Sequence, residues 1–238
     1  MLGRTLLSTF LCLSFTNSGV LTSPSVGLEE SAACPVLHMI VARASTEMSG
    51  EGIIGTVASK VKQQLSGSTS EAIEYPATLN NYASSEGKGV DAMIAAVEAQ
   101  ENKCPGGKIA LLGYSQGAHV IGDALSGGST ASFSFGSFGM RRLGRRQLSS
   151  ANIVAVVLMG DPSFVTGKAY DVGTSKRNGL FARKDTAALD ACADKIQSYC
   201  DSDDTFCASG QSTAVHLSYV STFGDAAAGF IVEKATAP

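Results

Sequence analysis

The chain contains no tryptophan, and only 16% of its 238 residues are charged. Lys and Arg total 18 against 21 Asp and Glu, and the formal net charge of −3 gives no overall attraction to nucleic acid or to an anionic membrane. Internal repeats, low-complexity linkers and an appended Cys- and Trp-rich binding module are also absent from the sequence. We therefore expect one domain that acts on a neutral substrate.

No apolar run approaches the length of about 20 residues that a membrane-spanning helix needs. The first run, Leu6 to Phe15, follows the basic Arg4 and is followed by small polar residues. This order is typical of a secretory signal peptide, which we place at residues 1–18, with cleavage between Ser18 and Ser23. The sequence predicts a secreted, extracellular protein without stable membrane insertion. The alternative is an intracellular protein whose first residues form an amphipathic segment.

Cysteines are few, and the predicted signal peptide contains one of the six, so five remain after its removal. Cys34 and Cys104 each precede an expected strand, so a disulfide between them would join the starts of neighbouring strands. Cys200 and Cys207 would close a short loop, which leaves Cys192 as the candidate free thiol. No CxxC or HxxxH spacing supports a metal site, and we expect neither a metal nor another cofactor.

Short apolar stretches alternate along the chain with segments of helical periodicity. The expected strands cover residues 36–41, 72–75, 109–112, 153–159 and 196–199. Helices are expected up to residue 65, over 91–99, from 116 onward, and over 226–234. Strands alternating with helices predict an α/β fold, a three-layer sandwich whose central, mostly parallel, five-stranded sheet has helices on both faces.

The segment from Lys108 to Leu125 reads KIALLGYSQGAHVIGDAL and places Ser115 between two glycines, after a strand pattern and before a helix pattern. Gly113 and Gly117 lack side chains where the chain must reverse sharply, as in a nucleophile elbow. The alternative is a glycine-flanked turn with an incidental serine. Because a hydroxyl is a poor nucleophile at neutral pH, Ser115 needs a base beside it.

Histidine is the usual base, and the chain has only three. His119 follows Ser115 by four residues on the same expected helix and cannot approach the hydroxyl from the solvent side. His38 lies inside the first expected strand, where a packed core role is expected. His216 lies late in the chain, in a Ser/Thr-rich loop before the final helix, and fits the order nucleophile, acid, histidine. We therefore select His216.

The carboxylate that orients the base is less clear, because two loops offer candidates. Asp161 ends the strand that follows the elbow strand in sequence. Asp201, Asp203 and Asp204 lie between Cys200 and Cys207, shortly before His216. Topology slightly favours Asp161, but sequence spacing leaves both loops open.

Three features together resemble the cutinase and acetylxylan esterase family of secreted serine esterases, carbohydrate esterase family five. They are the motif GYSQG, the segment ARASTE at positions 42–47, and a Cys-xxx-Asp-xx-Cys loop followed by a histidine. The resemblance extends from about Ala33 to Lys234. It implies an α/β-hydrolase fold without a lid, one catalytic domain over residues 33–238, and a monomer.

The resemblance assigns roles to individual residues. It implies that Asp204 is the acid, so Asp161 would instead cap a turn. It also implies that Ser45 contributes its hydroxyl and amide to an oxyanion hole, together with the amide of Gln116. The chain departs from the family in its odd cysteine and in Ala44, where many cutinases have glycine.

Two charged groups are expected to lie outside the site. Arg43 and Glu47 are interpreted as a surface ion pair. The basic stretch from Arg141 to Arg146 is interpreted as a solvated loop, with anionic-polymer binding or dibasic processing as the alternatives.

The predicted function is a secreted carboxylic-ester hydrolase acting on plant cell-wall esters by a Ser-His-Asp mechanism. The residues before the histidine, GQSTAVH, are small and polar, which favours a short acyl group and thus deacetylation of xylan. The alternative is a cutinase that hydrolyses cutin or other aliphatic polyesters. A more remote alternative is a secreted binding protein that has lost catalysis. The expected partner is a polysaccharide or polyester substrate.

Overall fold

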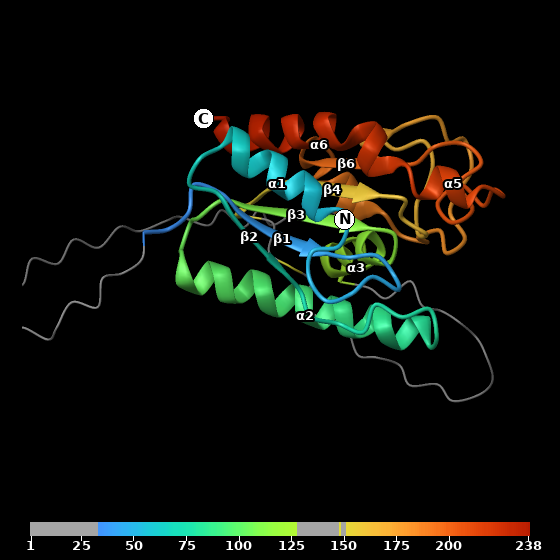
Figure 1. The fold of residues 1–238 in the computed structure, drawn as a ribbon, viewed down its shortest axis with the longest axis horizontal. Coiled ribbons are helices and arrows are strands. Elements are labelled where there is room, and N and C mark those ends of the chain that lie inside the picture. The colour runs from blue at the N-terminus through green and yellow to red at the C-terminus, as the bar shows by residue number, and fades with distance from the viewer. Residues whose placement is uncertain (1–32, 128–147, 149–150) are drawn as a thin grey trace, which may run out of the picture. The chain divides into compact units, whose positions relative to one another are not determined.

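A six-stranded parallel sheet is the centre of the unit formed by Cys34–Pro238 (Figure 1). Its strands are β1 (His38–Ala42), β2 (Thr69–Ala72), β3 (Ile109–Tyr114), β4 (Ile153–Met159), β5 (Asp171–Val172) and β6 (Ile196–Tyr199). They lie in the order β2-β1-β3-β4-β6-β5. The sixth strand was not expected, because β5 has only two residues and is too short for a periodic pattern. It pairs only with β6.

The structure is a computed structural model, and it describes residues 33–127, 148 and 151–238. The predicted signal peptide, residues 1–18, and the basic stretch Arg141–Arg146 lie outside the described residues. Within the described ranges, no helix combines the length and the apolar character needed to cross a membrane.

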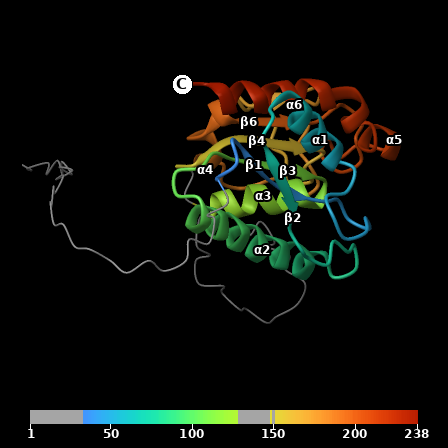
Figure 2. The same ribbon diagram turned by 60° about the vertical axis from the view of Figure 1, so that its left-hand side comes forward.

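Helices cover both faces of the sheet, as Figures 1 and 2 show from two directions. The helices are α1 (Gly55–Gln64), α2 (Tyr82–Lys103), α3 (Gln116–Ser126), α4 (Ala187–Asp190), α5 (Thr213–His216) and α6 (Tyr219–Thr236), with a 3-10 turn at Ala193–Lys195. Helices α1 and α6 pack on one face, and α2 and α3 on the other. The expected three-layer α/β sandwich is confirmed.

Alternate side chains of the central strands enter two separate cores. In β1, Met39 and Val41 pack with α1 and α6, whereas Ile40 and Ala42 pack with α2 and α3. Successive strand residues point to opposite faces, so burial on both faces makes β1 continuously apolar. This pattern explains why the central strands were recognisable without an alternation of polar residues.

Several expected boundaries were wrong: α6 begins at Tyr219, seven residues before the expected start at residue 226. The errors in α2 and β2 each have a packing cause. Helix α2 begins at Tyr82, nine residues before the expected start, because its first half carries small and polar residues at buried positions. Gly89 is one of them: a Cβ there would lie 2.6 Å from Val120, so a small residue is required for α2 to approach α3. The edge strand β2 ends at Ala72, and the apolar Ile73 and Tyr75 that suggested a strand are core residues beyond it.

The parallel sheet brings the carboxyl ends of its strands to one edge. The segments that follow β1, β3, β4 and β6 therefore start from that edge, and they contain Ser45, Ser115, Asp161 and Asp204 respectively. This arrangement makes the edge the place where a site can be assembled.

Both expected disulfides are present in the structure. One joins Cys34 to Cys104 across a sequence separation of 70, the other joins Cys200 to Cys207 across a separation of 7, and Cys192 is a free cysteine. A disulfide stabilises the fold by restricting the unfolded chain, and the effect grows with loop length. In the chain-entropy model the Cys34–Cys104 bridge contributes about 4 kcal/mol and the Cys200–Cys207 bridge about 2.5 kcal/mol.

We predict that replacing Cys34 and Cys104 together by serine lowers the free energy of unfolding by about 4 kcal/mol. Chemical unfolding under oxidising conditions measures this change, with Cys192→Ser as the matched control because that thiol closes no loop. A double variant as stable as the control would show that the bridge does not constrain the unfolded chain.

Candidate active site

Ser115 stands in a strained turn between β3 and α3. Its backbone has φ 53° and ψ −115°, in a region that residues other than glycine rarely occupy. The turn is possible because the two flanking glycines lack side chains. A Cβ on Gly113 would lie 2.6 Å from the carbonyl oxygen of Gly117. The Ser115 amide donates to the carbonyl of Met159 at 2.8 Å, which ties the elbow to the end of β4.

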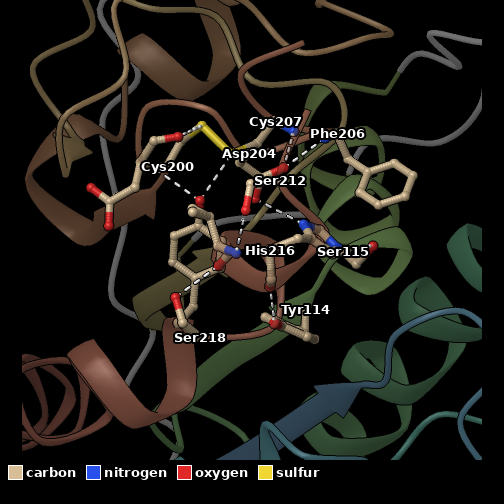
Figure 3. Close-up of polar contacts among 12 residues, drawn as sticks. Tyr114, Ser115, Cys200, Asp204, Phe206, Cys207, Ser212, His216 and Ser218 are labelled. Atoms are coloured by element: carbon tan, nitrogen blue, oxygen red, sulfur yellow. Dashed lines mark hydrogen bonds and ion pairs between the residues drawn. A yellow bond between two sulfur atoms is a disulfide. The ribbon is translucent and has the colours of Figure 1, made fainter. Parts of the chain in front are cut away.

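Ser115, His216 and Asp204 form a continuous hydrogen-bonded chain (Figure 3). His216 Nε2 lies 3.0 Å from Ser115 Oγ, and His216 Nδ1 lies 2.9 Å from Asp204 Oδ2. Since an ionised carboxylate can only accept, Nδ1 carries the proton, and the lone pair of Nε2 faces the serine hydroxyl. All three residues are buried, at 8%, 5% and 0% exposure respectively. The arrangement can remove a proton from Ser115.

The loop closed by the Cys200–Cys207 disulfide holds Asp204. Asp204 Oδ1 accepts hydrogen bonds from the backbone amides of Phe206 at 2.6 Å and Cys207 at 2.9 Å. Burial raises the pKa of this carboxyl, but the hydrogen bond and charge of His216 and the two amides outweigh burial, so its pKa lies below the ordinary 3.8. Asp204 therefore remains an anion well into the acidic range.

His216 is the last residue of α5, and not part of a loop as expected. The four-residue helix begins after Ser212, whose hydroxyl accepts a hydrogen bond from the Val215 amide at 3.2 Å. This serine cap was the signal in the sequence that could have indicated the helix. The Tyr114 hydroxyl donates to the His216 carbonyl, and the Phe206 ring lies 4.5 Å from the imidazole, between centroids. These contacts fix the position of the His216 imidazole.

The alternative residues considered from the sequence have other partners. Asp161 Oδ1 accepts from the Ser163 amide at 2.8 Å, as in the expected turn cap, and Oδ2 also pairs with Arg183 at 3.5 Å. His119 Nδ1 lies 3.0 Å from the hydroxyl of Tyr82. His38 Nδ1 lies 2.7 Å from Thr69 Oγ1, between the first residues of β1 and β2.

One group of possible metal ligands occurs among the described residues, formed by Glu86, His119 and Asp123, with ligand atoms within 4.8 Å of one another. All three side chains are buried, and Asp123 already forms an ion pair with Arg183. A cation there would compete with this guanidinium. The chain of Ser115, His216 and Asp204 does not include any member of this group.

Ser45 lines the same cleft as Ser115, Gln116 follows Ser115 in sequence, and both residues offer hydrogen-bond donors. Ser45 Oγ is buried and has no hydrogen-bond partner among the described residues. The Gln116 amide is the first of α3, a position that lacks an intrahelical acceptor. The side chain of Gln116 is occupied elsewhere, because Nε2 donates to the Thr78 carbonyl at 3.2 Å and Oε1 accepts from Ser85 at 3.0 Å.

The expectation that Arg43 and Glu47 form a surface ion pair was wrong. Arg43 is only 4% exposed, and its guanidinium donates to backbone carbonyls of Glu47, Ile73 and Tyr75. The Glu47 carboxylate accepts from the Ala44 amide at 2.6 Å. The sequence gives little sign of this, since an Arg and a Glu separated by four residues are usually solvated.

A cleft of about 410 Å³ opens over Ser115 and His216. Ser45, Thr46 and Thr213 contribute hydroxyl groups to its lining. The larger part of the lining is apolar and comes from several segments: Ala44, Leu79, Tyr82, Tyr114, Pro162, Leu180, Phe181, Phe206 and Leu217. The mouth is thus more apolar than the segment GQSTAVH suggested, because most of these side chains are distant from His216 in sequence.

Backbone strain is concentrated in the segments around this cleft. The described residues other than glycine with positive φ are Thr46, Ala77, Asn81, Ser115, Asp203 and Ser209. Thr46 and Ser115 line the cleft, and Asp203 directly precedes Asp204. Such conformations cost about 1–3 kcal/mol each and persist only where the surrounding structure holds them. Their location here is typical of a functional site.

The chain was compared with known families and proteins. A family model described as Cutinase matches residues 33–235. Acetylxylan esterase 2 of Talaromyces purpureogenus is 36% identical over 237 residues, which cover 95% of this chain and 98% of that protein. Cutinase 11 of Verticillium dahliae is 35% identical over 220 residues, covering 88% of this chain and 72% of that protein.

Solved structures are also similar. The catalytic core domain of acetyl xylan esterase from Trichoderma reesei superimposes with a TM-score of 0.73 at 34% sequence identity. The superposition covers 85% of this chain and 100% of that structure.

We predict that Asp204 stabilises the fold through its lowered pKa. A group with a depressed pKa contributes stability above its unfolded pKa of about 3.9, and this contribution is lost as the pH falls through the folded pKa. Unfolding free energies of the wild type and of Asp204→Asn, measured between about pH 5 and pH 2, should therefore converge below about pH 4. A difference that stays constant down to pH 2 would contradict the role assigned to the carboxylate.

Proposed function

The chain belongs to the cutinase family, and from this membership and the geometry of the site we propose that it is a secreted serine esterase that deacetylates xylan. One observation carries the catalytic part of the proposal: His216 lies within hydrogen-bond distance of both Ser115 Oγ and the Asp204 carboxylate. A hydroxyl, an imidazole and a carboxylate in this order are the parts needed for nucleophilic attack on an ester.

The reaction proceeds in two similar halves. His216 takes the proton of Ser115 as the serine oxygen attacks the ester carbonyl, and Asp204 stabilises the resulting imidazolium. The alcohol leaves with that proton, and an acyl group remains on Ser115. Water, deprotonated by His216, then attacks the acyl group and releases the acid. No step requires a metal or another cofactor.

Ser45 and the Gln116 amide are the proposed oxyanion hole. The Ser45 hydroxyl is buried and has no partner among the described residues, and Ser45 lines the same cleft as Ser115, so its hydroxyl is available to an oxygen that becomes negatively charged. A donor of this kind is typically worth about 100-fold to 1000-fold in rate, because it is fixed in place before the charge develops.

Two features bear on the acyl group. Similarity to an acetylxylan esterase extends over 95% of the chain, which supports acetyl as the group removed. The apolar rim of the cleft, with Leu79, Leu180 and Leu217 half exposed, favours a second candidate function, the hydrolysis of cutin or another aliphatic polyester. Both substrates are esters of the plant cell wall.

The domain and its location complete the proposal. We place one catalytic domain at residues 33–238, since the family match covers residues 33–235. The apolar segment of residues 1–18 would direct the chain out of the cell, and two disulfides suit an oxidising environment. We propose that the enzyme acts as an extracellular monomer.

We predict that kcat/KM for nitrophenyl esters is highest with acetate in a series from acetate to palmitate, and that acetylated xylan releases acetic acid. If the apolar cleft instead holds the acyl chain, each added methylene contributes about 0.8 kcal/mol, and activity rises about fourfold per methylene. A maximum at butyrate or beyond would support the polyester candidate.

The same series with Ser115→Ala tests the catalytic assignment. Loss of the nucleophile should lower kcat by at least about 10⁴-fold while the fold is retained. Ser163→Ala is a matched control, because that buried serine bonds to Asp161 and does not line the cleft. Activity of Ser115→Ala close to that of the control would overturn the proposed mechanism.

A further inference from the structure

The segment Arg43–Glu47 follows β1 and brings Ser45 to the cleft, yet the charged side chains at both of its ends are turned inward. Arg43 Nε donates to the Glu47 carbonyl at 3.1 Å, which closes the segment on itself. Its two other nitrogens donate to the carbonyls of Ile73 at 3.4 Å and Tyr75 at 2.5 Å. A buried guanidinium is stable only where its donors are satisfied, so these carbonyls define one position for the segment.

The Glu47 carboxylate fixes the amides on either side of the turn. Oε2 accepts from the Ala44 amide at 2.6 Å, and Oε1 accepts from the Ile53 amide at 2.8 Å. The carboxylate can reach these positions because residue 52 is glycine: a Cβ there would collide with the Glu47 carboxylate. The peptide between Arg43 and Ala44, one residue before Ser45, is thereby held by a charge-assisted hydrogen bond.

Tyr75 makes two further contacts with Arg43. Its hydroxyl donates to the Arg43 carbonyl at 2.5 Å, and the Arg43 guanidinium lies 5.0 Å above the centre of its ring. Burial raises the pKa of Tyr75, and the nearby Arg43 lowers it less, so the phenol stays protonated and remains a donor. Tyr75 thus contacts both the backbone and the side chain of the residue that begins the segment.

The opposite side of the segment contacts the nucleophile elbow directly. A Cβ on Gly117 would collide with the carbonyl of Ala42 and would lie 2.7 Å from the carbonyl of Arg43. The Thr46 amide donates to the Ala77 carbonyl at 2.6 Å, and this bond holds Thr46 at φ 69°. Ser45 is therefore confined between α3 and a buried polar network.

We propose that Arg43, Glu47 and Tyr75 are positioning residues that hold the Ser45 hydroxyl where the oxyanion of the proposed ester hydrolysis forms. The inference rests on that proposed function. An oxyanion hole accelerates a reaction because its donors are oriented before charge develops, and a misplacement of about 1 Å can cost about 100-fold. The ground-state ester needs this donor much less, so the effect belongs in kcat and not in KM.

Two variants each change the network by a single group. Glu47→Gln keeps the side-chain volume but leaves one oxygen for two amides, and Tyr75→Phe removes only the hydroxyl bonded to Arg43. We expect kcat to fall about tenfold in each, with KM changed less than twofold. The matched control is Tyr199→Phe, which removes a buried tyrosine hydroxyl whose partner, Gln197, lies in the same strand.

A double-mutant cycle with Ser45→Ala separates positioning from a loss of stability. If Glu47 acts through Ser45, the double variant Ser45→Ala with Glu47→Gln should be no slower than Ser45→Ala alone. Independent effects that multiply would overturn the inference, and so would a lower Tm with an unchanged kcat. If Glu47→Gln does not fold, the same cycle with Tyr75→Phe decides the question.

The rate of Ser115 labelling by a serine-directed phosphonate distinguishes this inference from the proposed function. Wild type that forms no adduct on Ser115 would overturn the proposed function and the inference with it. Wild type that reacts, with Glu47→Gln and Tyr75→Phe reacting equally fast, would overturn only the inference. We expect labelling of both variants to be about tenfold slower than labelling of wild type and of Tyr199→Phe.

Discussion

The hydrogen bond between the Ser115 hydroxyl and His216 Nε2 is the contact on which the proposed activity depends, and it joins residues 101 positions apart in sequence. Neither residue could hold it alone. Ser115 is presented by a strained turn that two glycines permit, whereas His216 is held by the Tyr114 hydroxyl, the Asp204 carboxylate and the Phe206 ring. The parallel sheet makes the contact possible, because the strands before these segments end at the same edge.

The strained and buried polar groups of the site lie next to two tightly packed apolar cores. Positive φ angles in residues other than glycine and a buried guanidinium each cost stability, and both occur in the segments around the cleft. Two apolar cores, one on each face of the sheet, and the long-loop disulfide Cys34–Cys104 offset these costs. Strain and buried charge are therefore found in the segments around the cleft, and the scaffold beneath follows ordinary packing rules.

Much of the fold could be predicted because its determinants are local. Strand β4 has the predicted bounds, since a continuous apolar run marks a strand buried on both faces. Strand β5 and the first half of α2 were missed because two residues form no pattern and because Ser85, Glu86 and Gly89 are buried through contacts distant in sequence. Ser115 and His216 could be selected from motif and chain order. Asp204 needed the family resemblance, because spacing did not separate it from Asp161.

Burial of charge was the main feature that the sequence did not reveal. Nothing in the sequence distinguishes Arg43 and Glu47 from a solvated ion pair, because their partners are backbone groups of residues 44, 53, 73 and 75. The apolar rim of the cleft was hidden for the same reason: it gathers Leu79, Leu180 and Phe206 from separate segments. Acyl preference therefore depends on tertiary contacts that no single stretch of sequence contains.

The structure of the phosphonate adduct tests the central claim most directly. We expect phosphorus bonded to Ser115 Oγ, with one phosphonyl oxygen about 3 Å from both Ser45 Oγ and the Gln116 amide, and His216 Nε2 facing the leaving-group side. An adduct on a different residue, or one on Ser115 whose phosphonyl oxygen points into solvent away from both donors, would contradict the account.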